Sequence, residues 1–210
     1  KTAEYTYFSF KAGTQFYQLK NSKMVKSTKI SSSIVTSGAF ANIDGYLISG
    51  RSASKFTRSY IKITQGKYKG KYVKISDNVA TRISEDEYKR RVVSDYAASM
   101  DGGRYVYGGS SYRATDCSGL TMQCYAKIGI SLPHKASSQA NYGTSVSYSN
   151  MKKGDLIFFG GSSYSSIYHV AIYIGDGKMI HAENTYTGIV MSYVSSFAKY
   201  NNITCIKRLI

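Results

Sequence analysis

The periodicity of the apolar residues changes at Ser84, and this change divides the chain into two parts. Before Ser84, short segments alternate between two faces as half-buried strands do, and residues 66–76, GKYKGKYVKIS, show this most clearly. Ser84 and Glu87 have the spacing of a capping box, and apolar residues then recur at helical spacing through Met100. We therefore predict a small all-β domain at residues 1–83 and a second domain, beginning with a helix, at residues 84–210.

The second domain has helices first and strands afterwards. A turn at Asp101-Gly102-Gly103 ends the first helix, and a second helix is expected to open at Asp116-Cys117 and to end at Gly129. Strands are expected at residues 155–159, 168–174, 178–183, 189–194 and 203–209. In the first domain, strands are expected at residues 4–10, 13–19, 34–35, 46–48, 60–63 and 66–76. This order predicts an α+β fold in which helices pack on an antiparallel sheet.

Positive charge is concentrated in the first domain. The chain carries 28 Lys and Arg against 12 Asp and Glu, a net charge of +16; residues 1–83 hold 15 basic and 3 acidic residues, and residues 84–210 hold 13 and 9. The net charges of +12 and +4 indicate an anionic partner for the first domain. No nucleic-acid motif is present and the charges are scattered over strands, so nucleic acid is not the expected partner. No apolar run is long enough to span a membrane, and the first residues lack the apolar core of a signal peptide.

The three cysteines favour a reactive thiol over a disulfide framework or a zinc site. Their number is odd, and the spacing of Cys117 and Cys124 relative to the histidines is not that of zinc ligands, so no metal is expected. Cys117 would stand at the beginning of a helix, where backbone N–H groups and the helix dipole lower the pKa of a thiol. Cys124, two helical turns later, and Cys205, on a strand, are interpreted as core residues.

Two histidines are expected to face the same side of one hairpin. His169 and His181 flank a turn at Gly175-Asp176-Gly177, and pairing of residue 174 with residue 178 places both imidazoles on one face. With Cys117 they could form a nucleophile, a base and an orienting group. His134, in a loop after Pro133, is the weaker candidate.

Several motifs occur together and in a fixed order in the second domain. They are YVYGG at 105–109, DCSGL at 116–120, GISLP at 129–133, Gln139, KKGDLIFF at 152–159, HVAIYIGDGKMIHA at 169–182 and GIV at 188–190. Together they resemble the NlpC-type family of bacterial cell-wall cysteine endopeptidases over residues 84–210. Residues 1–83 resemble, more loosely, the bacterial SH3-like modules that often precede this catalytic domain.

The resemblance implies a papain-like fold and hydrolysis of an amide bond in the stem peptides of peptidoglycan, next to D-glutamate. By position, Cys117 would be the nucleophile, His169 the general base and acid, and His181 the residue that orients the imidazole. Tyr105, with the backbone N–H of Cys117, would stabilise the oxyanion. A further implied pair, Asp116 and Ser118, would line the substrate groove. No cofactor is implied.

One segment departs from the family pattern. Many members have Leu-Pro-Arg followed by a hydroxyl residue and a serine, whereas this chain has Leu132-Pro133-His134-Lys135-Ala136. Ala136 removes a hydroxyl that some relatives use to hold the amino terminus of the substrate. The departure therefore concerns specificity and leaves the catalytic residues in place.

The expected protein is a monomeric, secreted or wall-associated enzyme whose signal peptide has been removed. Its expected partners are stem peptides and, for the basic first domain, anionic polymers of the cell wall. Two alternatives remain open from the sequence: a wall-binding protein whose catalytic domain is inactive, and an amidase or acyltransferase on a related core.

Overall fold

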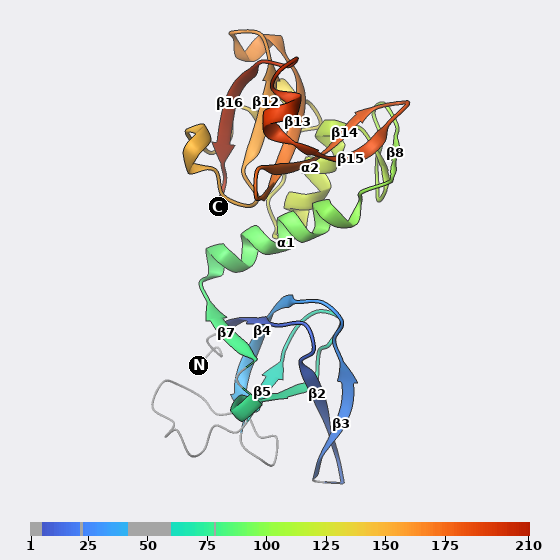
Figure 1. The fold of residues 1–210 in the computed structure, drawn as a ribbon, viewed down its shortest axis with the longest axis vertical. Coiled ribbons are helices and arrows are strands. Elements are labelled where there is room, and N and C mark those ends of the chain that lie inside the picture. The colour runs from blue at the N-terminus through green and yellow to red at the C-terminus, as the bar shows by residue number, and fades with distance from the viewer. Residues whose placement is uncertain (1–5, 22, 42–59, 78) are drawn as a thin grey trace. The chain divides into compact units, whose positions relative to one another are not determined.

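The chain forms two compact units, Lys1–Tyr88 and Lys89–Ile210. The computed structural model describes residues 6–21, 23–41, 60–77 and 79–210 (Figure 1). Helix α1 (Glu85–Ser99) begins in the first unit and continues into the second.

Within the described residues, the first unit is an antiparallel sheet of seven strands in the order β3-β2-β6-β5-β4-β1-β7. Its elements are β1 (Thr6–Phe10), β2 (Gln15–Lys20), β3 (Lys23–Lys29), β4 (Ile34–Ala41), β5 (Tyr60–Ile63), β6 (Tyr72–Lys74), the 3-10 turn η1 (Ile75–Asp77) and β7 (Ala80–Ile83). The core of this unit includes Phe8, Phe10 and Phe16, and the last two rings meet edge to face with centroids 6.1 Å apart. The predicted all-β character of this part is confirmed for the described residues.

Only some of the strands predicted for the first unit are present in the structure. The strands expected at 4–10, 13–19, 34–35 and 60–63 are present as β1, β2, β4 and β5, while residues 46–48 lie outside the described part. The strand expected over 66–76 is wrong for most of its length: Gly66 and Gly70 have positive φ angles of 72° and 83°, which turn the chain, and only β6 is strand. Strands β3 and β7 lack a buried apolar face, so their sequences carry no alternation signal.

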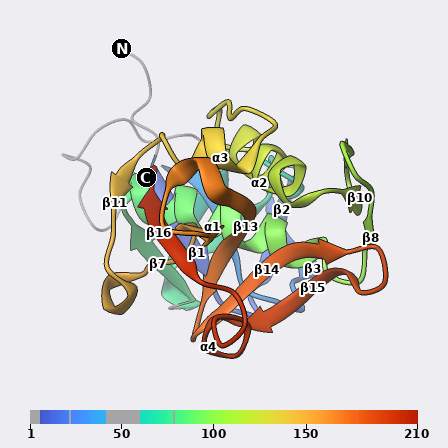
Figure 2. The same ribbon diagram turned by 90° about the horizontal axis from the view of Figure 1, so that it is seen from above.

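The second unit has the predicted α+β order, helices before the main sheet. Its described elements after α1 are β8 (Arg104–Tyr105), β9 (Ser110–Ser111), β10 (Ala114–Thr115), α2 (Cys117–Ala126), α3 (Ala136–Gln139), β11 (Thr144–Ser145), η2 (Tyr148–Asn150), β12 (Leu156–Gly160), η3 (Tyr164–Ser166), β13 (Ile167–Gly175), β14 (Lys178–Asn184), β15 (Gly188–Tyr193), α4 (Val194–Phe197) and β16 (Ile203–Arg208). The described strands form an antiparallel sheet in the order β11-β16-β12-β13-β14-β15 and a small sheet in the order β8-β10-β9. Figure 2 shows β13, β14 and β15 side by side.

Both long helices begin at polar caps. The backbone N–H of Glu87 donates to the Ser84 hydroxyl at 3.1 Å, and three acidic residues follow Ser84 in the first turn of α1, where they complement the helix dipole. Asp116 caps α2 by accepting from the N–H of Gly119 at 2.7 Å. The helix starts predicted at Ser84 and at Asp116-Cys117 are therefore confirmed.

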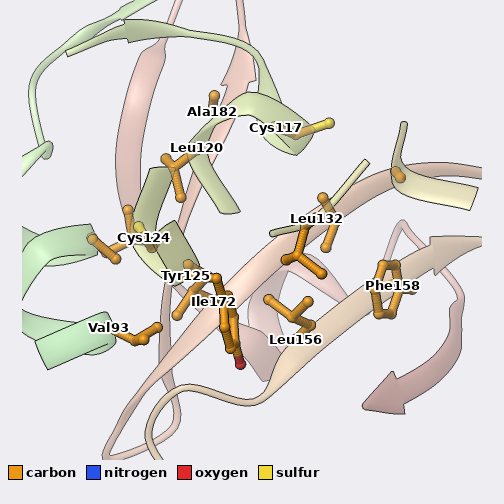
Figure 3. Packing of buried hydrophobic residues seen from close by; sticks show 14 of the residues in the cluster. Val93, Cys117, Leu120, Cys124, Tyr125, Leu132, Leu156, Phe158, Ile172 and Ala182 are labelled. Atoms are coloured by element: carbon orange, nitrogen blue, oxygen red, sulfur yellow. The ribbon is translucent and has the colours of Figure 1, made fainter. Parts of the chain in front are cut away.

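The sheet of the second unit is buried on both faces. On one face, Val93 of α1 and Leu120, Cys124 and Tyr125 of α2 pack against Leu156 and Ile172 (Figure 3). On the other face, a second cluster contains Ile157, Phe159, Ala171, Met179, Val194 and Ile206. Neighbouring residues of β12 and β13 thus point into different cores, so His169 shares a face with Ala171 and not with Val170. The sequence-based face assignment for this strand is confirmed.

The β13–β14 hairpin turns through Asp176 and Gly177, which have φ angles of 53° and 70°. Two consecutive residues with positive φ are typical of the tight turns that match the twist of a hairpin. Ile172 pairs with Ile180, as the expected register requires, but a shift after Tyr173 pairs Gly175 with Lys178. The expected pairing of residue 174 with residue 178 is therefore wrong at the turn, where an extra residue is accommodated, and correct in the body of the hairpin.

Candidate active site

Cys117 is the first residue of α2, and Tyr125 lies near the other end of the same helix (Figure 3). Its neighbour Asp116 organises the helix start. One carboxylate oxygen of Asp116, Oδ1, accepts from the Ser118 hydroxyl at 3.0 Å and is 2.9 Å from Nε2 of His134, in addition to its bond from Gly119. The other oxygen, Oδ2, accepts from the N–H of Gly108 at 2.9 Å. Asp116 therefore joins the loop after β8, the start of α2 and the loop that carries His134.

Cys117 opens into a cleft with a volume of about 310 Å³. The residues that line it are Tyr105, Tyr107, Gly108, Asp116, Cys117, Ser118, His134, Lys135, Ala136, Ser137, Ile167 and Tyr168. Four of the six predicted site residues, Tyr105, Asp116, Cys117 and Ser118, thus meet in one cleft, although they come from two separate parts of the chain. The aromatic rings and hydroxyls suit a peptide, because they offer both apolar contact and hydrogen bonds.

The thiol of Cys117 has a raised pKa, contrary to the sequence-based expectation. Burial, with a smaller contribution from Asp116, raises this pKa to about 11. Backbone N–H groups of Val170, Ser118 and Cys117 itself act on the sulfur and lower the pKa, but burial outweighs them. The helix start therefore provides the expected favourable groups, while only the tertiary structure shows that the thiol is 8 % exposed and keeps its proton at neutral pH.

His169 and His181 are directly hydrogen-bonded. Nε2 of His169 lies 2.8 Å from Nδ1 of His181, and Nε2 of His181 lies 3.0 Å from the hydroxyl of Ser192. Burial lowers the pKa of His169 to about 3, with a smaller contribution from His181. Burial also lowers the pKa of His181 to about 4, although Glu183 opposes this shift. Both imidazoles are therefore neutral at physiological pH.

The histidine pair connects to Cys117 through strand β13. The N–H of Val170 acts on the Cys117 sulfur, and Val170 directly follows His169 in the chain. Because Nε2 of His169 faces His181, Nδ1 is the nitrogen left for another partner. The cleft wall at this point is formed by Ile167 and Tyr168, and His169 itself is 6 % exposed.

Tyr105 keeps its phenolic proton. Burial raises the pKa of Tyr105, and the neighbouring Cys117 and Asp116 raise it further. A protonated hydroxyl close to Cys117 can donate a hydrogen bond to a developing negative charge.

His134 has a more prominent place than the sequence indicated, because it lines the cleft and bonds to Asp116. Gln139 positions its loop: Nε2 of Gln139 donates to the carbonyls of Ser118 and Pro133 at 3.0 Å and 2.7 Å. Ala136, the departure from the family pattern, also lines the cleft, and a hydroxyl is present one residue later, on Ser137.

The other cysteines lie outside the cleft. Cys124 is fully buried in the core, as expected, and burial raises the pKa of its thiol. Cys205 is only partly buried at the edge of the same core, so its assignment as a core residue holds in part.

Residues 102–208 match the model of the NlpC/P60 family. The chain belongs to the NlpC/P60 family. It is 34 % identical over 126 residues to the murein DD-endopeptidase MepS/murein LD-carboxypeptidase of Escherichia coli K12, covering 56 % of this chain and 65 % of that protein. It is 43 % identical over 79 residues to a gamma-D-glutamyl-L-lysine dipeptidyl-peptidase of Bacillus cereus, covering 37 % of this chain and 24 % of that protein.

Among solved structures, the chain is similar to the NlpC/P60 domain of the peptidoglycan hydrolase SagA. The sequence identity is 32 % and the TM-score 0.51, covering 57 % of this chain and 97 % of that domain. The chain spans less than two thirds of the length of both curated relatives. The NlpC/P60 match therefore establishes the family.

In the described parts of the chain, no helix is both long and apolar enough to cross a membrane. Among the same residues, no group of three or more His, Cys, Asp or Glu side chains is arranged to hold a metal ion.

Sequence reasoning missed two neighbours of the histidine pair, Ser192 and Phe197. Ser192 lies on β15, which pairs with β14 so that Met179 is opposite Ser192 and Val190 is opposite His181. The loop between β14 and β15 leaves this register open in the sequence, so no local pattern places Ser192 beside His181. Phe197 ends the four-residue helix α4, whose first residue, Val194, was expected to end a strand.

Proposed function

We propose that this chain is a cysteine peptidase that hydrolyses an amide bond in peptidoglycan stem peptides, next to D-glutamate. The observation that carries the proposal is a cysteine at a helix start, open to a cleft, beside strand β13, whose His169 is linked by hydrogen bonds to His181 and through it to Ser192. In this proposal the second unit is a papain-like catalytic domain. The names of the relatives support peptidoglycan as the substrate class.

The proposed reaction begins with a neutral thiol and a neutral imidazole. Nδ1 of His169 takes the proton of Cys117 as the sulfur attacks the scissile carbonyl carbon. The tetrahedral intermediate collapses when His169 gives this proton to the leaving amine, and a thioester remains on Cys117. Water then attacks the thioester with His169 again as the base, which releases the acid and restores the thiol. His181 orients the imidazole throughout.

The oxyanion of the intermediate would be stabilised by Tyr105 and by the backbone N–H of Cys117. Tyr105 is suited to this role because its raised pKa keeps the donor proton in place. Asp116 and Ser118 line the groove, and their hydrogen bond to each other leaves the remaining capacity of the Ser118 hydroxyl for the substrate.

The experiment that tests this function is mass spectrometry of the fragments released from purified peptidoglycan. We expect fragments with a new amino terminus or a new carboxyl terminus at one stem-peptide bond, and the residues on either side define that bond. A wall-binding protein would release nothing. An amidase would release the whole stem peptide from muramic acid, and an acyltransferase would give fragments whose mass includes an added acceptor.

The low pKa of His169 predicts a broad pH optimum. The catalytic base must be neutral, and His169 is neutral at every pH above about 3, so kcat/KM on a soluble stem peptide should change less than about twofold between pH 5 and pH 7. A histidine with an ordinary pKa near 6.5 would give a change of roughly 25-fold over the same range. An acid limb centred near pH 6.5 would contradict the burial of His169 in the working enzyme.

We further propose that the first unit is an SH3-like module that binds anionic wall polymers. Up to Ile83, its described residues include eleven Lys and Arg but one acidic residue, Asp77. Four of these lysines are exposed along the β2–β3 hairpin: Lys20, Lys23, Lys26 and Lys29. Such a concentration of one charge attracts polyanions, and the attraction weakens as salt screens it.

Changing the four hairpin lysines to Gln in the full chain is expected to weaken sedimentation with purified cell walls about tenfold at low salt. Binding of the unaltered chain should also fall when anionic polymers are stripped from the walls. The matched control removes the same charge from the second unit by changing Lys127, Lys152, Lys153 and Lys199 to Gln. Equal losses in both variants would show that total charge, and not the first unit, directs binding.

A further inference from the structure

Two side chains from the junction between β15 and α4 contact the hydrogen-bonded pair of His169 and His181. Ser192, near the end of β15, is hydrogen-bonded to His181, and Phe197, at the end of α4, contacts both imidazoles. The Phe197 ring centroid lies 4.7 Å from that of His181 and 5.6 Å from that of His169. Both residues act on groups that would perform the proposed chemistry, and neither lines the cleft.

The Ser192 hydroxyl is a required acceptor whenever Nδ1 of His169 serves as the base. A neutral imidazole whose Nδ1 is free to take a proton carries its own proton on Nε2, and the imidazolium keeps that proton, so Nε2–H of His169 donates to Nδ1 of His181 in both states. Nδ1 of His181 can accept only if the proton of His181 is on Nε2. That N–H points at Ser192 Oγ, 3.0 Å away. Because His181 is fully buried, an Nε2–H without an acceptor would cost free energy.

Phe197 provides an apolar cover for the same pair. It also packs edge to face on Phe159, with centroids 4.9 Å apart, and the ring of Phe159 lies 6.0 Å from that of His169. The cover is fixed because α4 is anchored at its first residue: Val194 is fully buried, and its N–H donates to the carbonyl of Gly177 at 2.8 Å. Water is therefore kept from one side of both imidazoles.

We propose that Ser192 and Phe197 are positioning residues of the active site: Ser192 fixes the tautomer of His181 that His169 needs when it holds the proton of Cys117, and Phe197 keeps the pair neutral between turnovers. The inference rests on the proposed function. It extends the catalytic arrangement from Cys117, His169 and His181 to a fourth hydrogen-bonding group and an aromatic cover. Within the described residues, the charged group that acts on His181 is Glu183, and the titratable group that acts on His169 is His181.

The first test compares Ser192→Ala with Ser192→Thr, which keeps the hydroxyl. Ser192→Ala is expected to lower kcat about tenfold with KM changed less than twofold, because the hydroxyl acts on the catalytic base through His181 and does not touch substrate. Ser192→Thr should restore kcat to within about threefold of the parent. In NMR spectra of protein with ¹⁵N-labelled histidine, the His181 Nε2–H signal should persist in the Thr variant and shift or weaken in the Ala variant.

The second test compares Phe197→Ala with Phe197→Leu by NMR titration of His169. Loss of the cover in the Ala variant should move the pKa of His169 upward toward 6.5, and the acid limb of kcat/KM should move with it. The Leu variant, which keeps an apolar side chain, should titrate closer to the parent. If Phe197 had a purely structural role, its replacement by Ala would lower the stability of the protein without moving the acid limb of kcat/KM.

The proposal is overturned if Ser192→Ala retains kcat within twofold and the His181 tautomer is unchanged, or if the His169 titration is the same in all Phe197 variants. The NMR readouts need no substrate, so they separate this inference from the proposed function. A parent protein that leaves peptidoglycan intact while its histidines respond as described would refute the function and support the positioning roles.

Discussion

Replacing Cys117 by Ala should abolish hydrolysis, with a loss of at least about 10⁴-fold in kcat, because none of the other residues that line the cleft is a cysteine and the thioester cannot form without a thiol. The fold should be retained. The Cys117 side chain neither caps α2 nor holds a loop in place, because the Asp116 side chain does both through its four hydrogen bonds. The measurement is the rate of fragment release from peptidoglycan, followed by mass spectrometry, together with Tm.

Cys205→Ala is the matched control for this experiment. Cys205 is also a free and partly accessible cysteine, but it lies on β16, away from the cleft-lining residues. We expect this variant to keep its activity within about twofold. Equal activity of Cys117→Ala and the parent would refute a covalent mechanism, and equal loss in both variants would indicate damage to the fold.

Replacing Asp155 by Asn should destabilise the second unit by about 3–5 kcal/mol, the range found when one partner of a buried ion pair is removed. The carboxylate of Asp155 is fully buried and accepts two bonds from the Arg208 guanidinium, at 2.9 Å and 2.7 Å, and one from the N–H of Lys152 at 2.7 Å. Nη1 of Arg90, itself buried, is 3.7 Å from the same carboxylate. A neutral amide would leave two guanidinium groups without their counter-charge.

Urea unfolding measured by circular dichroism tests this prediction, and Asp176→Asn is its control. Asp176 is exposed at the tip of the β13–β14 turn, where its φ angle of 53° also suits Asn, so the same chemical change should alter stability by less than about 0.5 kcal/mol. If the two variants were equally stable, the ion pairs around Asp155 would not contribute to the fold as the geometry indicates.

Several parts of the candidate site follow from local sequence. Cys117 is predicted to begin a helix because an aspartate precedes it and an apolar helical pattern follows. His169 and His181 are predicted to share a face because a short turn at Gly175-Asp176-Gly177 and the two-residue period of strands relate their positions. The structure places these elements as expected, apart from the shift at the turn.

Other properties of the site depend on residues far apart in the chain. The thiol of Cys117 was expected to have a lowered pKa, since the helix start is the only influence visible in the sequence. The opposite shift arises from burial, to which elements across the second unit contribute. Likewise, nothing near His181 in the sequence indicates Ser192, because their contact depends on the register of β14 with β15.

The sequence by itself determined the family, the α+β order, the helix starts and the cysteine and histidines that are candidates for catalysis. These properties depend on local patterns, such as caps, turns and alternation, which short segments carry on their own. Only the tertiary structure decided which protonation states these groups have and which side chains support them. Desolvation and hydrogen-bonding distances depend on how distant segments pack, and a linear pattern does not encode them.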